Sequence, residues 1–184
     1  MIFTNTKIDN IEYVQPKDEQ EKRSVREFFK KYYKHVALDV FPNEEHEPFY
    51  NPLLIKGTDA SGKIVGSLFS CTPPLLAKKT FENPSQANLN RTKRLTFLEL
   101  VSSENNDKGI QVQLLNLLVE TSKNNGVKSI VGFVSTDNPL TSSLSSAGFN
   151  LLHPNEPLPP LQGIRWELPP DENSATTIWF YKML

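Results

Sequence analysis

An alternation of strand and helix patterns in the second half of the sequence constrains the fold more than any other feature. Residues 95–101 have an apolar strand pattern, and residues 108–124 have a leucine-rich helical pattern that ends at Asn125-Gly126. A second strand pattern covers residues 129–135, and residues 139–147 predict a short helix with proline in its first turn. Strands joined by a helix lie parallel with a right-handed crossover, so the sequence predicts a parallel strand pair.

The first half of the chain predicts antiparallel strands beside that pair. Residues 11–14 read as a short strand, and residues 53–56 and 64–71 flank the turn-forming segment Asp59-Ala60-Ser61-Gly62 as a hairpin. A helix is expected from Asp18 onward. Its apolar stripe consists of Val25, Phe28, Phe29, Tyr32 and Val36. The economical architecture is an α/β (α+β mixed) fold, in which helices flank a mixed sheet.

Two segments are harder to interpret. The connection from Thr72 to Arg94 is long for a hairpin loop, so it is expected to hold a short helix or a functional lid. It is locally basic, but a run of charges is weak evidence for a phosphate-binding patch, so a solvated loop is favoured. Six of the 14 prolines lie between Pro154 and Pro170, around an expected strand at residues 163–167. Residues 176–183 predict the closing strand.

Composition excludes several classes of protein. With 38% hydrophobic residues and 11 Phe among 184 residues, the chain is too apolar to be disordered, and we expect a single domain over residues 1–184. The formal net charge of −1 disfavours nucleic-acid binding. The start of the chain does not resemble a signal peptide, and no apolar stretch approaches the length of a membrane span. A cytoplasmic protein without membrane contact is therefore expected.

Metal and nucleophile sites are not expected either. The single cysteine, Cys71, excludes an internal disulfide and a zinc site built from several cysteines. His35, His46 and His153 lie far apart without paired ligand spacing, so no metal site is predicted. Cys71 fits a small buried side chain better than a nucleophile. Gly-x-Ser-x-Gly, Walker and Rossmann glycine motifs are absent from the sequence.

The loop before the long helix is the strongest candidate for a binding site. Residues 102–107 lead into Lys108-Gly109-Ile110, the first turn of an apolar helix, whose amides can bind an anion. Gly109 would let a phosphate approach closely. Glu104 and Asp107 work against an anion, so the spacing alone favours an ordinary strand-to-helix loop over an anion site.

This order of elements, together with several residues of that segment, resembles the GNAT superfamily of N-acetyltransferases. Glu99-Leu100-Val101 ends the strand as the family's Leu-x-Val does, and Gly109 matches the family's central glycine. Asn106 stands at the family's Arg or Gln position, and Gln111 stands at its Gly or Ala position. These two residues and Glu99 depart from the family pattern.

The downstream half of the family pattern also has counterparts. The strand segment Val131-Gly132-Phe133-Val134 is followed by Asp137-Asn138 and then by Ala147-Gly148-Phe149. Leu144 holds the position of the family's tyrosine, and the last six residues, 179–184, resemble its final strand. The resemblance implies a GNAT-like sheet, mostly antiparallel with one central parallel strand pair, flanked by helices.

The resemblance also implies acetyl-CoA as the acyl donor. Its pyrophosphate would lie on amides near Asn106, Lys108, Gly109, Ile110 and Gln111. Its pantetheine arm would run beside Leu100 and Val101, with Asn138 near it.

An amine would attack the bound thioester directly. Glu99 or a water chain would take the amine proton. We expect Glu99 to share a strand face with Val101, although from the sequence alone an edge or solvent-facing glutamate is favoured over a base. Since Leu144 has no proton to donate to the departing sulfur, Ser143, Ser145 or a bound water would replace the tyrosine.

The acceptor is expected to be a positively charged amine, either a small molecule or a peptide. Acidic residues gather after the first helix, where the resemblance puts the acceptor entrance; they are Asp39, Glu44, Glu45 and Glu47, to which Asp171-Glu172 would add. A homodimer is possible. One rival is a non-catalytic protein of the same fold, acting as an acyl-CoA sensor or protein-interaction module. The other is a binding module that takes no CoA.

Overall fold

The computed structural model describes residues 1–33, 36, 40–42, 47–163 and 176–184. Within these ranges a mixed sheet of eight strands has the order β1-β2-β3-β4-β5-β6-β8-β7. The strands are β1 (Thr6–Ile8), β2 (Ile11–Val14), β3 (Leu53–Thr58), β4 (Ile64–Cys71), β5 (Leu95–Ser103), β6 (Ser129–Ser135), β7 (Asn150–Leu151) and β8 (Thr177–Met183). The pair β5–β6 is parallel and the other pairs are antiparallel, which confirms the predicted fold class.

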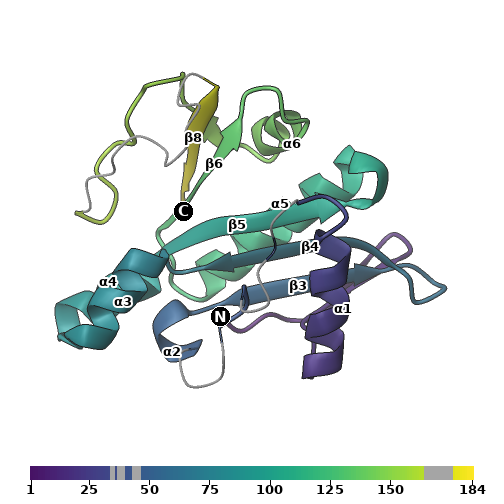
Figure 1. Ribbon diagram of the computed structural model, residues 1–184, viewed down its shortest axis with the longest axis horizontal. Coiled ribbons are helices and arrows are strands. Elements are labelled where there is room, and N and C mark those ends of the chain that lie inside the picture. Colours follow the sequence, from purple (N-terminus) through teal and green to yellow (C-terminus); the bar gives the residue numbers. More distant parts are fainter. Residues whose placement is uncertain (34–35, 37–39, 43–46, 164–175) are drawn as a thin grey trace.

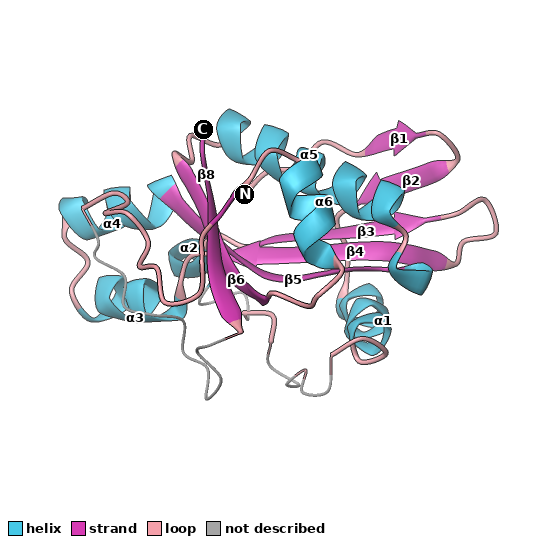
Figure 2. Ribbon diagram, turned by 90° about the horizontal axis from the view of Figure 1, so that it is seen from above, coloured by secondary structure: helices cyan, strands magenta, loops and turns pink. Residues whose placement is uncertain are grey.

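Helices cover both faces of this sheet (Figure 1). They are α1 (Glu19–Phe29), α2 (Glu47–Tyr50), α3 (Pro74–Glu82), α4 (Gln86–Arg94), α5 (Lys108–Asn124) and α6 (Leu140–Ser146), with a short 3-10 turn η1 (Glu104–Asn106). Figure 2 shows the sheet between α1 on one side and α5 with α6 on the other. None of the helices in the described part of the chain is long and apolar enough to cross a membrane.

The elements of the second half lie where the sequence predicts them. The helix α5 and the strand β6 have the predicted bounds, and β5 runs two residues past the predicted end at Val101. The connection between β4 and β5 holds two helices, α3 and α4, rather than one. The predicted strand at residues 163–167 falls outside the described residues, apart from Gly163, which lies in a turn.

The first helix is shorter than predicted. Asp18 caps it by accepting a hydrogen bond from the Glu21 N–H at 2.8 Å, but the helix ends at Phe29, before Tyr32 and Val36. The backbone tightens there, because the Tyr32 N–H donates to the Phe29 carbonyl three residues back. After this early end, Tyr33 reaches Val101 of β5 in the middle of the sheet. The short elements β1 and α2 were not predicted, since each has only three or four residues.

Alternating side chains of the strands build a core on each face of the sheet. On the α5 side, Leu53, Leu68 and Leu98 pack with Leu114 and Leu118 of the helix. A second core lies on the α1 side, where Leu54, Phe69 and Cys71 of the strands pack with Val25 and Phe29 of α1. The two cores fix β4 and β5 from both sides.

The parallel strands β5 and β6 touch at one end only. Their register covers residues 95–97 of β5 and 129–131 of β6. Beyond these residues β5 stays paired with β4 as far as Ser103, while β6 stays paired with β8 as far as Ser135. The two strands therefore separate toward their carboxyl ends, as Figure 1 shows.

Gly132, the first residue of β6 past this contact, is required by its neighbour on β8. A Cβ atom at Gly132 would overlap Cζ of the Phe180 ring. We expect Gly132→Ala to lower the free energy of unfolding by about 1–3 kcal/mol, because the buried ring has to move. Urea denaturation measures this change. The double variant Gly132→Ala, Phe180→Leu should cost less than the sum of the two single changes, and strict additivity would contradict the contact.

Candidate active site

A cavity of about 290 Å³ lies where β5 and β6 separate. Its wall is formed by both strands, by Tyr33, which lies four residues after the end of α1, and by the segment that leads into α6. The residues used below are Tyr33, Glu99, Leu100, Val101, Phe133 and Asn138. Ligands of sheets with parallel strands bind at the carboxyl ends of those strands, and this cavity lies at that end.

A β-bulge in β5 sets the orientation of Glu99. Phe69 of β4 faces Leu100, and the next residue of β4, Ser70, faces Leu98, so Glu99 is the extra residue. Val101 accordingly packs in the α5-side core, while Leu100 packs against the α1-side core. The Glu99 carboxylate lies 3.8 Å from the Cys71 sulfur, which is also on the α1 side. The expectation that Glu99 shares a face with Val101 was wrong, because the bulge reverses the alternation between them.

Glu99 is a half-buried carboxyl group in the cavity wall. Its burial raises its pKa above the ordinary value, and the contact with Cys71 lowers it by less. The pKa of the Cys71 thiol is raised as well, first by burial and then by the charge of Glu99. The thiol therefore stays protonated and can donate to the carboxylate. This agrees with the interpretation of Cys71 as a small buried side chain rather than a nucleophile.

The backbone of Val101 is bonded to a tyrosine hydroxyl rather than to a strand on this side. The Tyr33 hydroxyl donates to the Val101 carbonyl at 2.7 Å and accepts from the Val101 N–H at 3.2 Å. Burial raises the pKa of Tyr33, and the bond to the Val101 carbonyl lowers it by less. Sequence reasoning missed this residue. The apolar stripe of the predicted helix includes Tyr32 but not Tyr33, and no sequence motif marks Tyr33.

Asp107 occupies the start of the helix that follows β5. Its carboxylate accepts a hydrogen bond from the Ile110 N–H at 3.0 Å, and its carbonyl accepts from the Gln111 N–H. The amides of Lys108 and Gly109 point out of the first turn, where a helix provides no acceptors. Both residues are exposed, so these two amides are the donors open to an anion.

The loop in front of this helix is acidic as well as strained. Asn105 and the predicted binding residue Asn106 have φ angles of 54°, a conformation that asparagine tolerates better than most residues. Glu104 forms an ion pair with Lys63 from the β3–β4 turn. With Asp107 beside it, the loop presents both charge signs to a ligand.

The described cavity wall contains none of the predicted site residues of α5 and α6. Gln111 is buried between the two helices and accepts a hydrogen bond from the Ser143 hydroxyl at 2.7 Å. Ser145 is exposed on the outer side of α6. Leu144, at the position of the family's tyrosine, is fully buried in the α5-side core. Ile110 is half-buried over Gly66 of β4 and contributes packing.

Asn138 does lie in the cavity wall. Its side-chain oxygen accepts a hydrogen bond from the Leu140 N–H at 2.9 Å, which fixes the turn into α6. The Phe133 ring is exposed beside it, with its centroid 5.7 Å from that of Phe97. The cavity therefore combines an apolar wall with a few polar groups, as small-molecule sites do.

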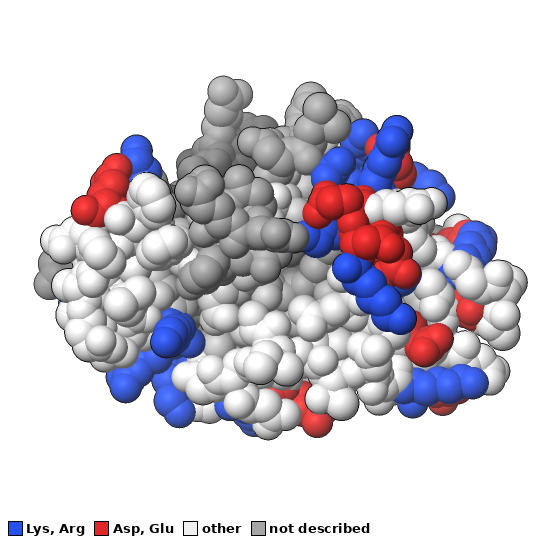
Figure 3. All heavy atoms as spheres, turned by 90° about the horizontal axis from the view of Figure 1, so that it is seen from below, with Lys and Arg blue, Asp and Glu red and all other residues white. Residues whose placement is uncertain are grey.

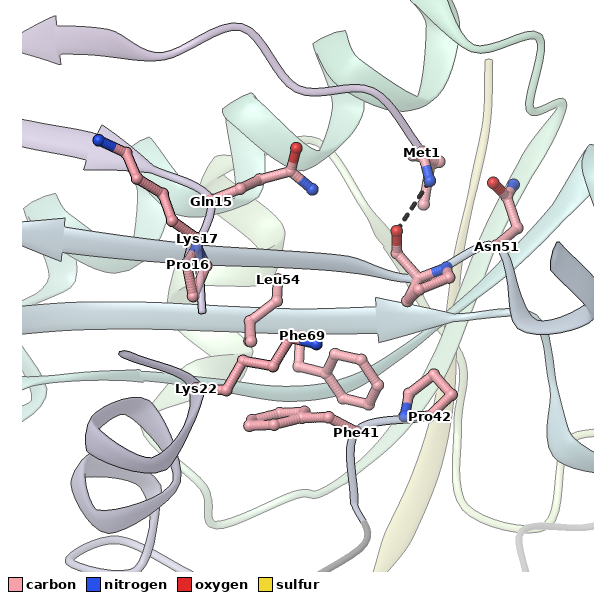
Figure 4. Close-up of a pocket in the computed structure, with 11 residues that line it drawn as sticks. Met1, Gln15, Pro16, Lys17, Lys22, Phe41, Pro42, Asn51, Leu54 and Phe69 are labelled. Atoms are coloured by element: carbon pink, nitrogen blue, oxygen red, sulfur yellow. Dashed lines mark hydrogen bonds between the residues drawn. The ribbon is translucent and has the colours of Figure 1, made fainter. Parts of the chain in front are cut away.

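The predicted acidic acceptor cluster lies largely outside the described residues. This is true of Asp39, Glu44, Glu45 and the Asp171-Glu172 pair, and only the backbone of Glu47 is described, at the start of α2. Lysines line a different cavity on the α1 side, which has a volume of about 630 Å³. Figure 4 shows Lys17 and Lys22 at that cavity, with Phe41 and Phe69 edge to face.

Charges of both signs are mixed on the face that carries α1. Figure 3 shows acidic and basic side chains side by side there. Ion pairs join Lys22 to Glu19 and Lys56 to Glu21. Among the described residues, no group of three His, Cys, Asp or Glu side chains is placed to hold a metal ion.

Comparison with known proteins identifies the fold. No protein-family model matches the chain, and no curated protein matches its sequence. Solved structures do match over nearly the whole length. Ard1 from Thermoplasma volcanium aligns with a TM-score of 0.63 and 10% identity, over 96% of this chain and 99% of that one. A GNAT-family acetyltransferase from Staphylococcus aureus aligns with a TM-score of 0.59 and 16% identity, over 95% and 99%.

The chain has the GNAT fold. A third match is the ribosomal-protein-S18-alanine N-acetyltransferase from Escherichia coli, with a TM-score of 0.57 and 13% identity, over 98% of this chain and 94% of that one. The structural alignments establish the fold, and the low identities do not establish the activity. The GNAT-like sheet with one parallel pair, expected from the sequence resemblance, is confirmed.

Proposed function

We propose that this protein is an N-acetyltransferase, which moves an acetyl group from acetyl-CoA to an amine. The observation that carries the proposal is the cavity between the separated ends of β5 and β6. It holds a half-buried carboxyl group, Glu99, two residues before Val101, whose backbone N–H points away from β4 and is bound by the Tyr33 hydroxyl. Acyl transfer to an amine needs both a base and a hydrogen-bond donor for the carbonyl oxygen.

Most of the cavity and part of the helix start fit acetyl-CoA. The pantetheine arm would lie along Leu100 and Val101 and reach Asn138, since all three line the cavity. The pyrophosphate would take the amides of Lys108 and Gly109. Of the other predicted contacts, the Ile110 amide is already bound by Asp107 and the Gln111 side chain is buried. Asp107 opposes the anion, so we expect a modest affinity.

The proposed reaction begins with attack of a neutral amine on the thioester carbonyl carbon. A C–N bond forms and the C–S bond breaks, so CoA leaves as a thiolate. Glu99 takes the proton from the amine nitrogen, directly or through a water. Its raised pKa suits this role, because a more basic carboxylate removes a proton more readily. Backbone N–H groups of the separated strands would stabilise the negative charge that develops on the carbonyl oxygen.

The departing thiolate does not require an acid from α6. The Ser143 hydroxyl donates a hydrogen bond to the Gln111 side chain, and Ser145 faces solvent, so neither lies at the cavity. A thiol with a pKa of about 8.5 leaves as a thiolate near neutral pH. We therefore propose that turnover depends on the placement of the thioester and the amine rather than on a general acid.

Leu144→Tyr tests this view. We expect no gain in kcat, because Leu144 is fully buried in the α5-side core and a phenol there would not reach the cavity. We expect the free energy of unfolding to fall by about 1–3 kcal/mol, because the core has no room for a larger, polar side chain. Steady-state assays and urea denaturation measure the two effects. A turnover restored by Leu144→Tyr in an otherwise silent protein would contradict this prediction.

The acceptor class is an amine of a small molecule or of a peptide. One structural match is an alanine N-acetyltransferase of a ribosomal protein, and another is described as a putative phosphinothricin N-acetyltransferase. The sequence-based prediction of a positively charged acceptor rests on residues outside the described ranges. Salt dependence of kcat/KM tests it, since capture of a charged amine weakens as ionic strength rises.

Two measurements test the proposed function. Acetyl-CoA at about 100 times its dissociation constant should add ~2.7 kcal/mol of stability, which a thermal shift detects. Release of the CoA thiol should then depend on added amines from a panel of small molecules and peptides. No thermal shift with any acyl-CoA would overturn the proposal. A clear shift without turnover on any amine would favour an acyl-CoA sensor with the same fold.

A further inference from the structure

The Tyr33 hydroxyl occupies the hydrogen-bonding position of a missing strand. Within the described ranges, no strand pairs with β5 on the β6 side past Phe97. Both polar backbone groups of Val101 are nevertheless satisfied there, because one hydroxyl donates to the carbonyl and accepts from the N–H. Val101 is buried, so leaving these groups unpaired would be unfavourable.

Tyr33 is held at this place from the α1 side. Its N–H donates to the Phe29 carbonyl at 3.0 Å, and its ring lies edge to face with that of Phe29, with centroids 6.1 Å apart. Phe29 belongs to the last turn of α1 and is fully buried. The end of the helix therefore aims the phenol at the separated strands. The hydroxyl lies in the same cavity as Glu99.

We propose that the Tyr33 hydroxyl occupies the hydrogen-bonding position that a ligand of this cavity takes. A ligand then binds only by displacing the Tyr33 hydroxyl from Val101. To replace both hydrogen bonds, the ligand must bring an acceptor to the Val101 N–H and a donor to the Val101 carbonyl. The class that fits is an extended chain that carries secondary amides, because such a chain pairs with a strand edge. This inference rests on the proposed function, in which the amide-bearing arm of CoA lies along Val101.

The Tyr33 hydroxyl should therefore lower the affinity of amide-bearing ligands only. A ligand that lacks amides gains nothing when Tyr33 leaves Val101, whereas the arm of CoA has to compete with the Tyr33 hydroxyl. Tyr33→Phe removes the competing hydroxyl and keeps the ring on Phe29. The Val101 groups can then bond water from the cavity until the ligand arrives. We expect the variant to fold and to bind CoA about 10-fold more tightly.

Isothermal titration of both proteins with CoA, pantetheine and ADP tests this inference. CoA and pantetheine carry the amides, so both should bind Tyr33→Phe about 10-fold more tightly than the wild type. ADP carries a pyrophosphate without amides, so its affinity should not change. Tyr32→Phe is the matched control. Tyr32 precedes Tyr33, and its ring centroid lies 5.2 Å from that of Phe28. Because Tyr32 does not line the cavity, the affinities for CoA, pantetheine and ADP should stay at the wild-type level.

Each outcome is decisive. Unchanged or weaker binding of CoA to Tyr33→Phe would show that the hydroxyl does not compete, and the inference would be wrong while the proposed function stands. A gain of equal size for ADP would also overturn it, because that gain would come from a general loosening of the site. If neither protein binds CoA or pantetheine, the proposed donor fails and this inference fails with it.

A second measurement uses the wild type alone. Nitration by tetranitromethane marks accessible tyrosines, and acetyl-CoA has no free thiol to consume the reagent. Mass spectrometry should find Tyr33 poorly nitrated without ligand and several-fold more nitrated with acetyl-CoA, while Tyr13, fully buried elsewhere, stays unmodified. Protection of Tyr33 by acetyl-CoA would contradict its displacement.

Discussion

Glu99→Gln is expected to lower kcat by about 10²–10⁴-fold while leaving the affinity for acetyl-CoA unchanged. The amide keeps the shape of the carboxyl group and fills the same space in the bulge of β5, but it cannot take a proton. Binding should persist because the pantetheine contacts proposed for Leu100, Val101 and Asn138 do not use the carboxylate. Steady-state kinetics and a thermal shift with acetyl-CoA separate the two effects.

The pH profile adds a readout that a structural role would not change. Burial raises the pKa of Glu99, and a base works only when it is deprotonated. The rate should therefore rise with pH through a pKa above that of an ordinary glutamate, and Glu99→Gln should remove this limb. Any limb that comes from ionisation of the amine acceptor stays in the variant.

The stability of the protein should respond to the same group with the opposite sign. A carboxyl group with a raised pKa binds its proton more tightly in the folded state than in the unfolded state. Its contribution is therefore fully present below the unfolded pKa and is lost as pH rises through the folded pKa. Glu99→Gln should flatten this part of the curve of unfolding free energy against pH, which urea titrations measure.

Glu12→Gln is the control for both experiments. Glu12 is an exposed glutamate of the edge region of the sheet, paired with Thr58 across β2 and β3. Its loss should change neither kcat nor the pH profile. If Glu99→Gln matches this control in kcat, Glu99 is not the base, and a water chain would have to take the amine proton.

The sequence predicts the fold well because the informative patterns are long. The helix α5 and the strand β6 have the bounds that periodicity indicates, since seventeen and seven residues repeat one signal. Their parallel arrangement then follows from the crossover rule. Short elements such as β1 carry too few residues to show a period, and only their pairing in the sheet defines them.

The site is predicted less well because it depends on local breaks in these patterns. The bulge at Glu99 shifts the register by one residue, and nothing in the segment Leu98-Glu99-Leu100-Val101 marks it. The early end of α1 brings Tyr33 to Val101, although periodicity alone would continue the helix. Both features are set by contacts between segments far apart in the chain, which a local pattern does not contain.

Gly109 is the residue that the sequence indicates most directly, and its replacement is expected to have a large effect on acetyl-CoA binding. Gly109→Glu should abolish the thermal stabilisation of several degrees that acetyl-CoA gives the wild type. The side chain would cover the amides of Lys108 and Gly109, and its charge would add to those of Glu104 and Asp107. A pyrophosphate would then meet three carboxylates at the start of α5.

The fold itself should tolerate this change. A Cβ atom at Gly109 would have Asp107 Oδ1 at 3.1 Å as its nearest contact, and glutamate in the first turn of a helix interacts favourably with its dipole. Gly109→Gln is the matched variant, because it has the same size without the charge. If bulk alone blocks the site, both variants lose the shift, and if charge dominates, Gly109→Gln keeps part of it. A wild-type thermal shift with acetyl-CoA in Gly109→Glu would show that the pyrophosphate does not bind at this helix start. Acetyl-CoA would then have to enter the cavity from another direction.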